Sequence, residues 1–359
     1  MSWLLAFLGF AALIILHEAG HFAAAKAVGM RVERFALFFP PLLARVRRGE
    51  TEYAVGAIPL GGYVRITGMN PQEEIPPEVA HRAYYRQPVW KRIVVIAAGP
   101  AVNILLAFVI LWALYLANGV SEATTTVESV AKNQPAAGKL APGDRIVAID
   151  GVRSTDFGVL RDQISAHSCR GEQRDGCRAA TPARVTVVRG DGPERTLTIT
   201  PVYSADVQRM LLGFSPASTD RAVGPIDAAG ISADSMWAFT RGTVETIAGI
   251  FDATKRQQIS GVVGSYETTR QAFQFSTEQA LFLLAVISLS LGVINLFPFL
   301  PLDGGHIFWA LAEKVRGRAI PFSVMERAGF VGFALVIALF MVGLTNDIGR
   351  LTGEGIQVR

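Results

Sequence analysis

Apolar residues are gathered into four long runs rather than spread along the chain. Each run comes close to the roughly 20 residues that a helix needs to cross the hydrocarbon core of a membrane. The four runs are approximately Trp3–Val28, Ile93–Ala117, Gln279–Leu300 and Ala328–Leu344. They predict a polytopic α-helical membrane protein with about four transmembrane helices, surrounded by a lipid bilayer.

The segment between the first two runs has a pattern typical of β-strands. Glu52–Ile66 alternates β-forming residues with glycine and proline, and it is preceded by Phe35–Val46. Together they predict a membrane-associated β-element made of one or more hairpins with short strands. The element is too apolar for a free loop. Two placements stay open: a sheet tucked into the membrane-facing side of the protein, or a soluble hairpin lying on the membrane surface.

Residues 124–201 have the composition of a soluble domain. The predicted elements are, in order, a turn at Pro142–Asp144, a strand up to the tight turn Asp150–Gly151, an amphipathic helix at Val159–His167, and a hairpin of Val185–Arg189 with Arg195–Thr200. This order resembles an α+β bacterial PDZ domain, and the pattern Leu-x-Pro-Gly-Asp-x-Ile-x-x-Ile-Asp-Gly from Leu140 is a fairly specific marker of one. Cys169–Thr181 departs from the pattern as an insertion. Whether such a domain binds a peptide carboxyl terminus or restricts access stays open.

Composition divides the chain into four parts. Residues 1–118 hold two transmembrane helices and the β-element, residues 119–204 the PDZ-like domain, residues 205–277 a linker, and residues 278–359 the last two transmembrane helices. Within the linker, Ala233–Ile250 predicts an amphipathic helix. Packing of this helix against the soluble domain is favoured over a partly lipid-facing position.

Charge adds an orientation in the membrane. The chain has 34 Lys and Arg against 30 Asp and Glu, and basic residues concentrate in residues 26–92 and 314–327, which flank apolar runs. Cytoplasmic loops carry such an excess, so both segments are expected inside and the PDZ-like domain outside. Because the membrane explains these basic residues, they give no support to a nucleic-acid partner, and none is expected.

The two cysteines agree with this orientation. Cys169 and Cys177 bracket a short polar loop in the segment predicted to lie outside. A disulfide between them is plausible if the loop faces an oxidising compartment, and two reduced, unrelated thiols are the alternative. Their spacing does not fit a zinc knuckle.

Candidate chemistry lies inside the first apolar run, at His17-Glu18-Ala19-Gly20-His21. On a helix, His17 and His21 lie one turn apart on the same face, so both imidazoles can reach one zinc ion. Glu18 lies beside them, where it can take a proton from a water molecule. Ionisable residues at membrane depth are costly unless they face protein, metal or water, so function is their default explanation.

A catalytic zinc ion usually has three protein ligands, so one more ligand is needed. Asp303, at the cytoplasmic end of the third apolar run, is the best candidate because the topology puts it on the same side as the two histidines. Gly304-Gly305 behind it would allow a close backbone approach. A helix cap or a turn former is the alternative role for Asp303. The topology places His167 on the far side of the membrane, and His81 is predicted to be a solvated surface residue.

Two further polar residues belong to the same region. Asn295 could hydrogen-bond a substrate carbonyl or stabilise a developing oxyanion. Alternatively, it could satisfy backbone groups freed where Pro298 and Pro301 break the helix. His306 could support a metal ligand, although an ordinary polar residue at the membrane edge is the favoured interpretation.

Five segments, in this order, span nearly the whole chain and carry a resemblance to a known family: His17–Phe22, Arg31–Phe35, Pro59–Val64, Ala98–Asn103 and Asn295–Gly305. They resemble the site-2 protease family of intramembrane zinc metalloproteases, in the bacterial branch with a PDZ domain. The resemblance implies a zinc metalloendopeptidase with Zn²⁺ held by His17, His21 and Asp303. It implies Glu18 as the catalytic acid and base and Asn295 as a substrate-positioning residue. It also implies that Pro59–Val64 pairs with the unwound substrate.

The same resemblance implies the substrates and the setting. The expected substrates are single-pass membrane proteins, already shortened on the outer side by another protease and cleaved in or near the transmembrane segment. Regulators resembling anti-sigma factors are one example, and the bacterial cytoplasmic membrane is the setting. The chain departs from the family in carrying one PDZ-like domain where some relatives carry two. Its second proline is Pro301 rather than a residue two positions after Pro298.

Two other functions compete with this one. The first is a membrane-anchored PDZ scaffold or quality-control protein with a non-catalytic metal site, against which the intact Glu18 argues. The second is a membrane-anchored protease that cuts soluble proteins at the membrane surface. Such enzymes usually take a later Glu on a soluble helix as the third ligand, whereas Asp303 lies in an apolar run.

Overall fold

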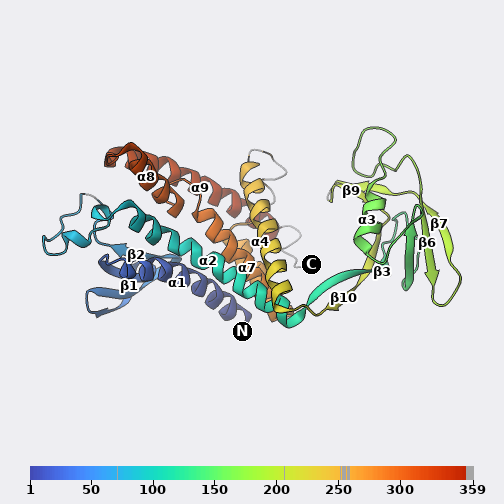
Figure 1. Ribbon diagram of the computed structural model, residues 1–359, viewed down its shortest axis with the longest axis horizontal. Helices are drawn as coiled ribbons and strands as arrows, with labels where there is room; N and C mark the ends of the chain where they lie inside the picture. The colour runs from blue at the N-terminus through green and yellow to red at the C-terminus, as the bar shows by residue number, and fades with distance from the viewer. Residues whose placement is uncertain (71, 206, 251, 253–255, 257–258, 353–359) are drawn as a thin grey trace. The chain divides into compact units, whose positions relative to one another are not determined.

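The chain folds into two compact units. The structure is a computed structural model that describes residues 1–359 except 71, 206, 251, 253–255, 257–258 and 353–359 (Figure 1). The first unit is Met1–Leu116 with Gly224–Arg359, and the second is Ala117–Val223. In the described chain, four helices are long and apolar enough to cross a membrane, and they match the four predicted runs: Ser2–Ala27, Val89–Asn118, Thr277–Asn295 and Ser323–Thr352.

Helices α1 (Ser2–Ala27), α2 (Val89–Asn118) and α7 (Thr277–Asn295) lie side by side (Figure 1). Lys91 at the start of α2 donates to the Val28 carbonyl at 3.0 Å, just past the end of α1, so these two helices run antiparallel. Glycines allow the close approach. A Cβ at Gly20 of α1 would lie 2.6 Å from the Ala98 carbonyl oxygen, and one at Gly292 of α7 would lie 3.0 Å from that of Pro100.

The third apolar run gives a shorter helix than its hydropathy predicts. Ser276 caps the start of α7 by accepting from the N–H groups of Glu278 and Gln279. The helix ends at Asn295 rather than Leu300, because the following segment contains Pro298 and Pro301, which cannot donate helical hydrogen bonds. A new helix, α8 (Asp303–Arg316), starts beyond the prolines. The predicted helix break is confirmed.

Helix α4 (Pro225–Ala248) is the predicted amphipathic helix of the linker, found with an earlier start. Its contacts are with helices of its own unit: Phe239 packs against Phe282 of α7 with ring centroids 5.8 Å apart, and Ser235 hydrogen-bonds Tyr115 of α2 at 3.0 Å. These contacts join α4 to α2 and α7 within the first unit.

Helices α6 (Val262–Phe275) and α9 (Phe322–Thr352) are joined by a buried acid. Asp347 of α9 is fully buried, and its carboxylate accepts from the N–H of Gly261 at 3.0 Å and of Gly264 at 2.7 Å. These are N–H groups at the start of α6, which have no partner within their own helix. Asp347 therefore caps α6 from another helix.

Strands β1 (Val32–Arg48) and β2 (Thr51–Ile66) form the β-element next to α1. They are two long strands rather than the predicted short ones. Residues 35–37 of β1 have partners on both sides: Phe35 pairs with Val64 and Tyr53, and Ala36 with Tyr63 and Ala54. The first half of β1 therefore lies between the two halves of β2. Repeated register shifts bend both strands and make this double pairing feasible.

The turn of this element is tied back to the end of α1. Gly49 adopts φ +62°, which suits glycine in a tight turn. The carboxylate of Glu50 accepts from Arg82 at 2.7 and 2.8 Å and from Lys26 at 2.6 Å. These cations lower the pKa of Glu50 from 4.5 to about 2. The element is thus fixed relative to the helix that carries the HExxH segment.

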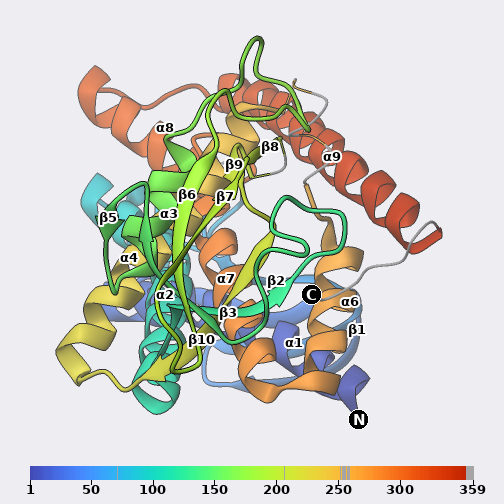
Figure 2. The same cartoon turned by 90° about the vertical axis from the view of Figure 1, so that its right-hand side faces the viewer.

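The second unit is built on one sheet with the strand order β10-β3-β4-β6-β7, and Figure 2 shows α3 beside it. Its elements are β3 (Val120–Val130), β4 (Asp144–Ile149), β5 (Val152–Arg153), α3 (Phe157–Ser165), β6 (Ala183–Arg189), β7 (Arg195–Ile199), β8 (Val202–Ser204), β9 (Arg209–Leu211) and β10 (Phe214–Arg221). The predicted strand, helix and hairpin are all present. The unit runs on to Val223, past the expected end at residue 204, because β10 pairs with β3.

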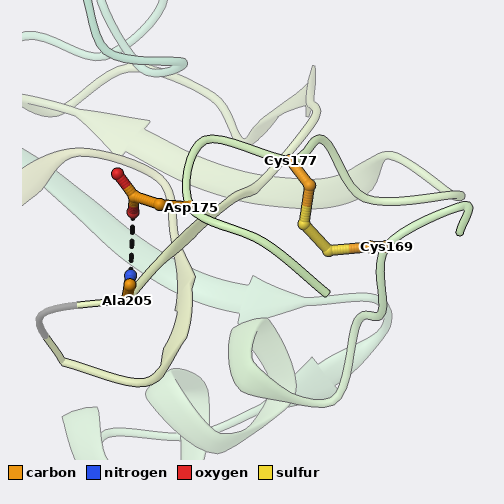
Figure 3. Close-up of a disulfide and its surroundings, with 4 residues drawn as sticks. All are labelled: Cys169, Asp175, Cys177 and Ala205. Atoms are coloured by element: carbon orange, nitrogen blue, oxygen red, sulfur yellow. Dashed lines mark hydrogen bonds between the residues drawn. A yellow bond between two sulfur atoms is a disulfide. The ribbon is translucent and has the colours of Figure 1, made fainter. Parts of the chain in front are cut away.

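Two local features hold this unit together. Asp144, at the predicted turn into β4, is fully buried and accepts from Arg189 at 2.7 and 2.8 Å, and this guanidinium lowers the pKa of Asp144. Cys169 and Cys177 form a disulfide across the inserted loop (Figure 3). Asp175 inside that loop accepts from the N–H of Ala205 at 2.8 Å. The sequence left open whether these cysteines are disulfide-bonded or reduced, and the structure shows the disulfide.

Candidate active site

His17, His21 and Asp303 meet at one point in the first unit. The two histidines lie one turn apart on α1 and are 8% and 7% exposed. Asp303 is the first residue of α8, so the helix break at the prolines brings it to the histidines. The Nε2 atoms of the two histidines are 3.2 Å apart, and each lies 3.3 Å from Oδ2 of Asp303. The predicted cluster is present in the geometry.

These three atoms fit the ligand positions of a zinc ion. Zinc bonds of about 2.0–2.1 Å in a tetrahedral arrangement place neighbouring ligand atoms about 3.3–3.4 Å apart. In the described chain, Oδ2 of Asp303 is buried and has no hydrogen-bond partner. His21 Nδ1 lies 2.9 Å from the Val95 carbonyl oxygen, which fixes the proton on Nδ1 and leaves Nε2 free to bind a metal. No sequence motif reveals this backbone partner.

Two glycines allow the close packing around Asp303 and His21. A Cβ at Gly305 would lie 2.5 Å from the Leu300 nitrogen, so α8 can begin directly against the broken segment before it. A Cβ at Gly99 of α2 would lie 2.6 Å from Cε1 and 2.8 Å from Cδ2 of the His21 ring. Real Cβ contacts are longer than this, so the imidazole occupies space that only glycine leaves open.

Glu18 lies between the metal-ligand cluster and the β-element. It follows His17 on α1, and a Cβ at Gly62 of β2 would lie 2.7 Å from Cγ of Glu18. A carboxylate at this place can serve as a base for chemistry at the neighbouring metal position. Strand β2 therefore passes directly over the residue predicted to be catalytic.

The other predicted residues lie in different places. Asn295 is half-buried as the last residue of α7, and no hydrogen bond joins it to the three clustered residues in the described chain. His81 is exposed, and His167 in the second unit contacts Asp150 at 2.9 Å and Thr181 at 3.1 Å. His306 lies in the first turn of α8 and is half-buried.

Comparison with known proteins agrees with this site. The profile of Peptidase family M50 matches residues 5–339, which is most of the chain. The chain belongs to peptidase family M50. The family assignment confirms the resemblance that the motifs carry, and the sequence of this M50 peptidase holds the HExxH segment inside the matched range.

The M50 peptidase is similar to several proteins along nearly its whole length. Zinc metalloprotease Rip1 of Mycobacterium bovis is 30% identical over 93% of this chain and 94% of that protein. A Rhizobium meliloti protein with "zinc metalloprotease" in its name is 30% identical over 95% of this chain and 94% of its own length. Among solved structures, the PDZ domain of an SdrC-like protein from Listeria monocytogenes is 21% identical, covers 27% of this chain and 92% of that domain, and has a TM-score of 0.21.

The family and the geometry give the same chemical description. The protein is a zinc metalloprotease with Zn²⁺ as its metal. It is an integral membrane protein, with four membrane-length apolar helices among the residues that the structure describes. Two imidazoles and one carboxylate, with a fourth position for water, are one of the ligand sets that catalytic zinc takes. The predicted cofactor and enzyme class are confirmed.

Proposed function

We propose that this M50 peptidase cleaves single-pass membrane proteins in or near their transmembrane segments. The observation that carries the proposal is the meeting of His17, His21 and Asp303 on elements that belong to, or directly follow, membrane-length apolar helices. A site built there is open to a substrate that arrives within the membrane. Regulators resembling anti-sigma factors, already shortened on the outer side, are substrates of this kind.

We assign His17, His21 and Asp303 as the zinc ligands. When bound, zinc supplies a Lewis acid that activates water and polarises the substrate carbonyl. Glu18 takes the proton of the attacking water and returns it to the nitrogen of the leaving amine. Asn295, at the end of α7, donates a hydrogen bond from its amide to the substrate carbonyl oxygen and stabilises the charge that develops there.

The β-element provides a place for the substrate backbone. A peptide bond inside a helix is shielded, so the substrate has to unwind, and its freed backbone groups need partners in the membrane. Residues 62–64 of β2 have strand partners on one side only in the described chain. A cleft of about 500 Å³ lies along the same stretch, lined by residues 63–66 with Met69, Asn70 and Glu73. An extended substrate added to this edge would run past Glu18.

Asp303→Asn tests the metal site. The substitution keeps the shape but replaces a carboxylate by a poor zinc ligand, so we expect bound zinc to fall from about one per chain to nearly none. Cleavage of a reconstituted single-pass membrane protein should be lost with it. Metal analysis of the full chain in detergent, together with a gel assay, measures both.

Asp347→Asn is the matched control, because it makes the same change at another buried carboxylate. Asp347 caps α6 and does not contact the metal-ligand cluster, so this variant should be less stable but retain its zinc. Full zinc content in Asp303→Asn would remove Asp303 from the site.

We further propose that the second unit lies outside the cytoplasmic membrane, with the β-element inside. The disulfide supports this orientation, because such bonds persist in oxidising compartments. The basic residues that flank the apolar helices support it as well. A membrane-impermeant thiol reagent should label Cys169 and Cys177 in intact cells after reduction. If the two cysteines are labelled only in broken cells, the second unit lies on the cytoplasmic side and the proposed orientation is wrong.

We also propose that the second unit binds the carboxyl terminus of a peptide, as PDZ domains do. Strand β10 is at the edge of the sheet, so one side of it can accept an added strand. In the described chain, the N–H groups of Leu212 and Gly213, just before this strand, have no hydrogen-bond acceptor, and Gly213 adopts φ +83°. Phe214 packs against Phe157 of α3 with ring centroids 6.0 Å apart, which places α3 beside this end of β10.

A peptide with an apolar last residue tests this binding in the full-length protein. The free carboxylate should bind at least about tenfold more tightly than the carboxamide of the same peptide, because charge-assisted bonds to N–H groups contribute about 1.5–3 kcal/mol. Fluorescence anisotropy measures both affinities. Equal affinities would show that the N–H groups before β10 do not bind the peptide carboxylate.

A further inference from the structure

Asn103 of α2 is a buried amide with no role in the reaction described above. Its side chain is 0% exposed, and neither Nδ2 nor Oδ1 has a hydrogen-bond partner in the described chain. Buried side-chain polar groups are nearly always paired, and more strictly so within a membrane, where water is scarce. An amide in this position therefore requires a partner that a small rearrangement or an internal water can supply.

The position of Asn103 is close to the metal-ligand cluster. It lies one helical turn beyond Gly99, on the same face of α2, and Gly99 packs against the His21 ring. On the α7 side, Ser288 donates to the Asn103 carbonyl at 2.9 Å, and a Cβ at Gly292 would lie 3.4 Å from Cβ of Asn103. The amide is thus enclosed where α2 meets α7.

His17 has the complementary unpaired atom. Its Nδ1 is buried and without a partner in the described chain, whereas Nδ1 of His21 has the Val95 carbonyl. His17 lies one helical turn before His21 on α1, and Asn103 lies one turn after Gly99 on α2. Because the two helices are antiparallel, both steps lead in the same direction along the helix pair. A histidine that binds metal through Nε2 carries its proton on Nδ1 and needs an acceptor there.

We infer that Asn103 is the positioning residue for His17. Its Oδ1 accepts a hydrogen bond from Nδ1–H of His17, directly after rotation of the amide or through one buried water. The bond orients the imidazole and fixes its tautomer, as the Val95 carbonyl does for His21. This inference rests on the proposed assignment of His17 as a zinc ligand.

Zinc affinity of the full-length protein in detergent, measured by competition with a chelator, tests the inference. Asn103→Leu removes the acceptor at nearly constant volume and should weaken zinc binding about 10–100-fold. Asn103→Asp keeps the acceptor oxygen and should restore most of the affinity. Ser288→Ala is the control, because it loosens the same contact between α2 and α7 without touching a ligand. It should lower the melting temperature and leave zinc affinity unchanged.

A second measurement needs no variant. In the zinc-loaded wild type with ¹⁵N-labelled histidine, the Nδ1–H of His17 should exchange with solvent much more slowly than the ring protons of exposed His81. Wild-type zinc affinity in Asn103→Leu, equal losses in Asn103→Leu and Ser288→Ala, or fast exchange at His17 would each overturn the inference. A different result, unchanged zinc affinity in His17→Ala, would remove His17 from the metal site itself.

Discussion

Replacing Glu18 with glutamine should slow peptide-bond cleavage by about 10²–10⁴-fold while the zinc content stays at one per chain. The amide has nearly the same shape as the carboxylate but cannot take a proton from water. Zinc should remain because the three atoms that converge on the metal position belong to His17, His21 and Asp303, not to Glu18. Cleavage of a reconstituted single-pass membrane protein and metal analysis of the same sample give the two values.

Glu278→Gln is the matched control for this experiment. Glu278 is an exposed carboxylate in the first turn of α7, away from the metal-ligand cluster, so the variant should cleave at the wild-type rate. Wild-type turnover by Glu18→Gln would mean that the metal site works without this base. A scaffold with a structural metal predicts a different outcome again, because then neither the wild type nor the variant cleaves.

The sequence predicts the membrane-length helices well, and it also singles out the three residues that meet in the structure. Both predictions have physical reasons. A membrane-spanning helix needs a long apolar run, and that requirement is visible without any tertiary contact. The ligands are visible because ionisable residues are rare at such depth. Asp303 adds a topological argument, since the predicted topology puts the end of the third run on the same side of the membrane as His17 and His21.

Other features depend on contacts across space and do not appear in the sequence pattern. The double pairing of β1 follows from register shifts, which hydropathy does not encode. Strand β10 belongs to the second unit through its pairing with β3, although the two are far apart in sequence, and the predicted domain end at residue 204 missed it. The hydrogen-bond partner of His21 is the backbone carbonyl of Val95. Every residue has such a carbonyl, so no residue type marks this partner in the sequence.

The packing glycines are an intermediate case. The segment Ala98–Asn103 is recognisable as a motif, but the sequence does not say what its glycine is for. The structure gives the reason at Gly99: the His21 imidazole lies where a side chain would begin. A residue that binds neither metal nor substrate can therefore be as necessary to the site as a ligand.

Gly99→Ala should consequently damage the site severely. The added methyl group would lie 2.6 Å from Cε1 of His21, so the imidazole has to leave the position in which it meets Asp303 and His17. A displacement of about 1 Å at a catalytic group can cost about 10²-fold in rate, and zinc binding should weaken as well. Cleavage assays and chelator competition on the full-length variant measure both losses.

Gly230→Ala separates this effect from the general effect of adding a methyl group to a helix. Gly230 lies within α4, and a Cβ there meets nothing within 4 Å. Alanine at such a position lowers the entropy of the unfolded chain and should raise the free energy of unfolding by about 0.4–1 kcal/mol, with cleavage unchanged. If Gly99→Ala behaves like Gly230→Ala, His21 has room to adjust and the contact with Gly99 does not set its position. If only Gly99→Ala loses zinc, the close approach of α1 and α2 is what holds the ligand in place.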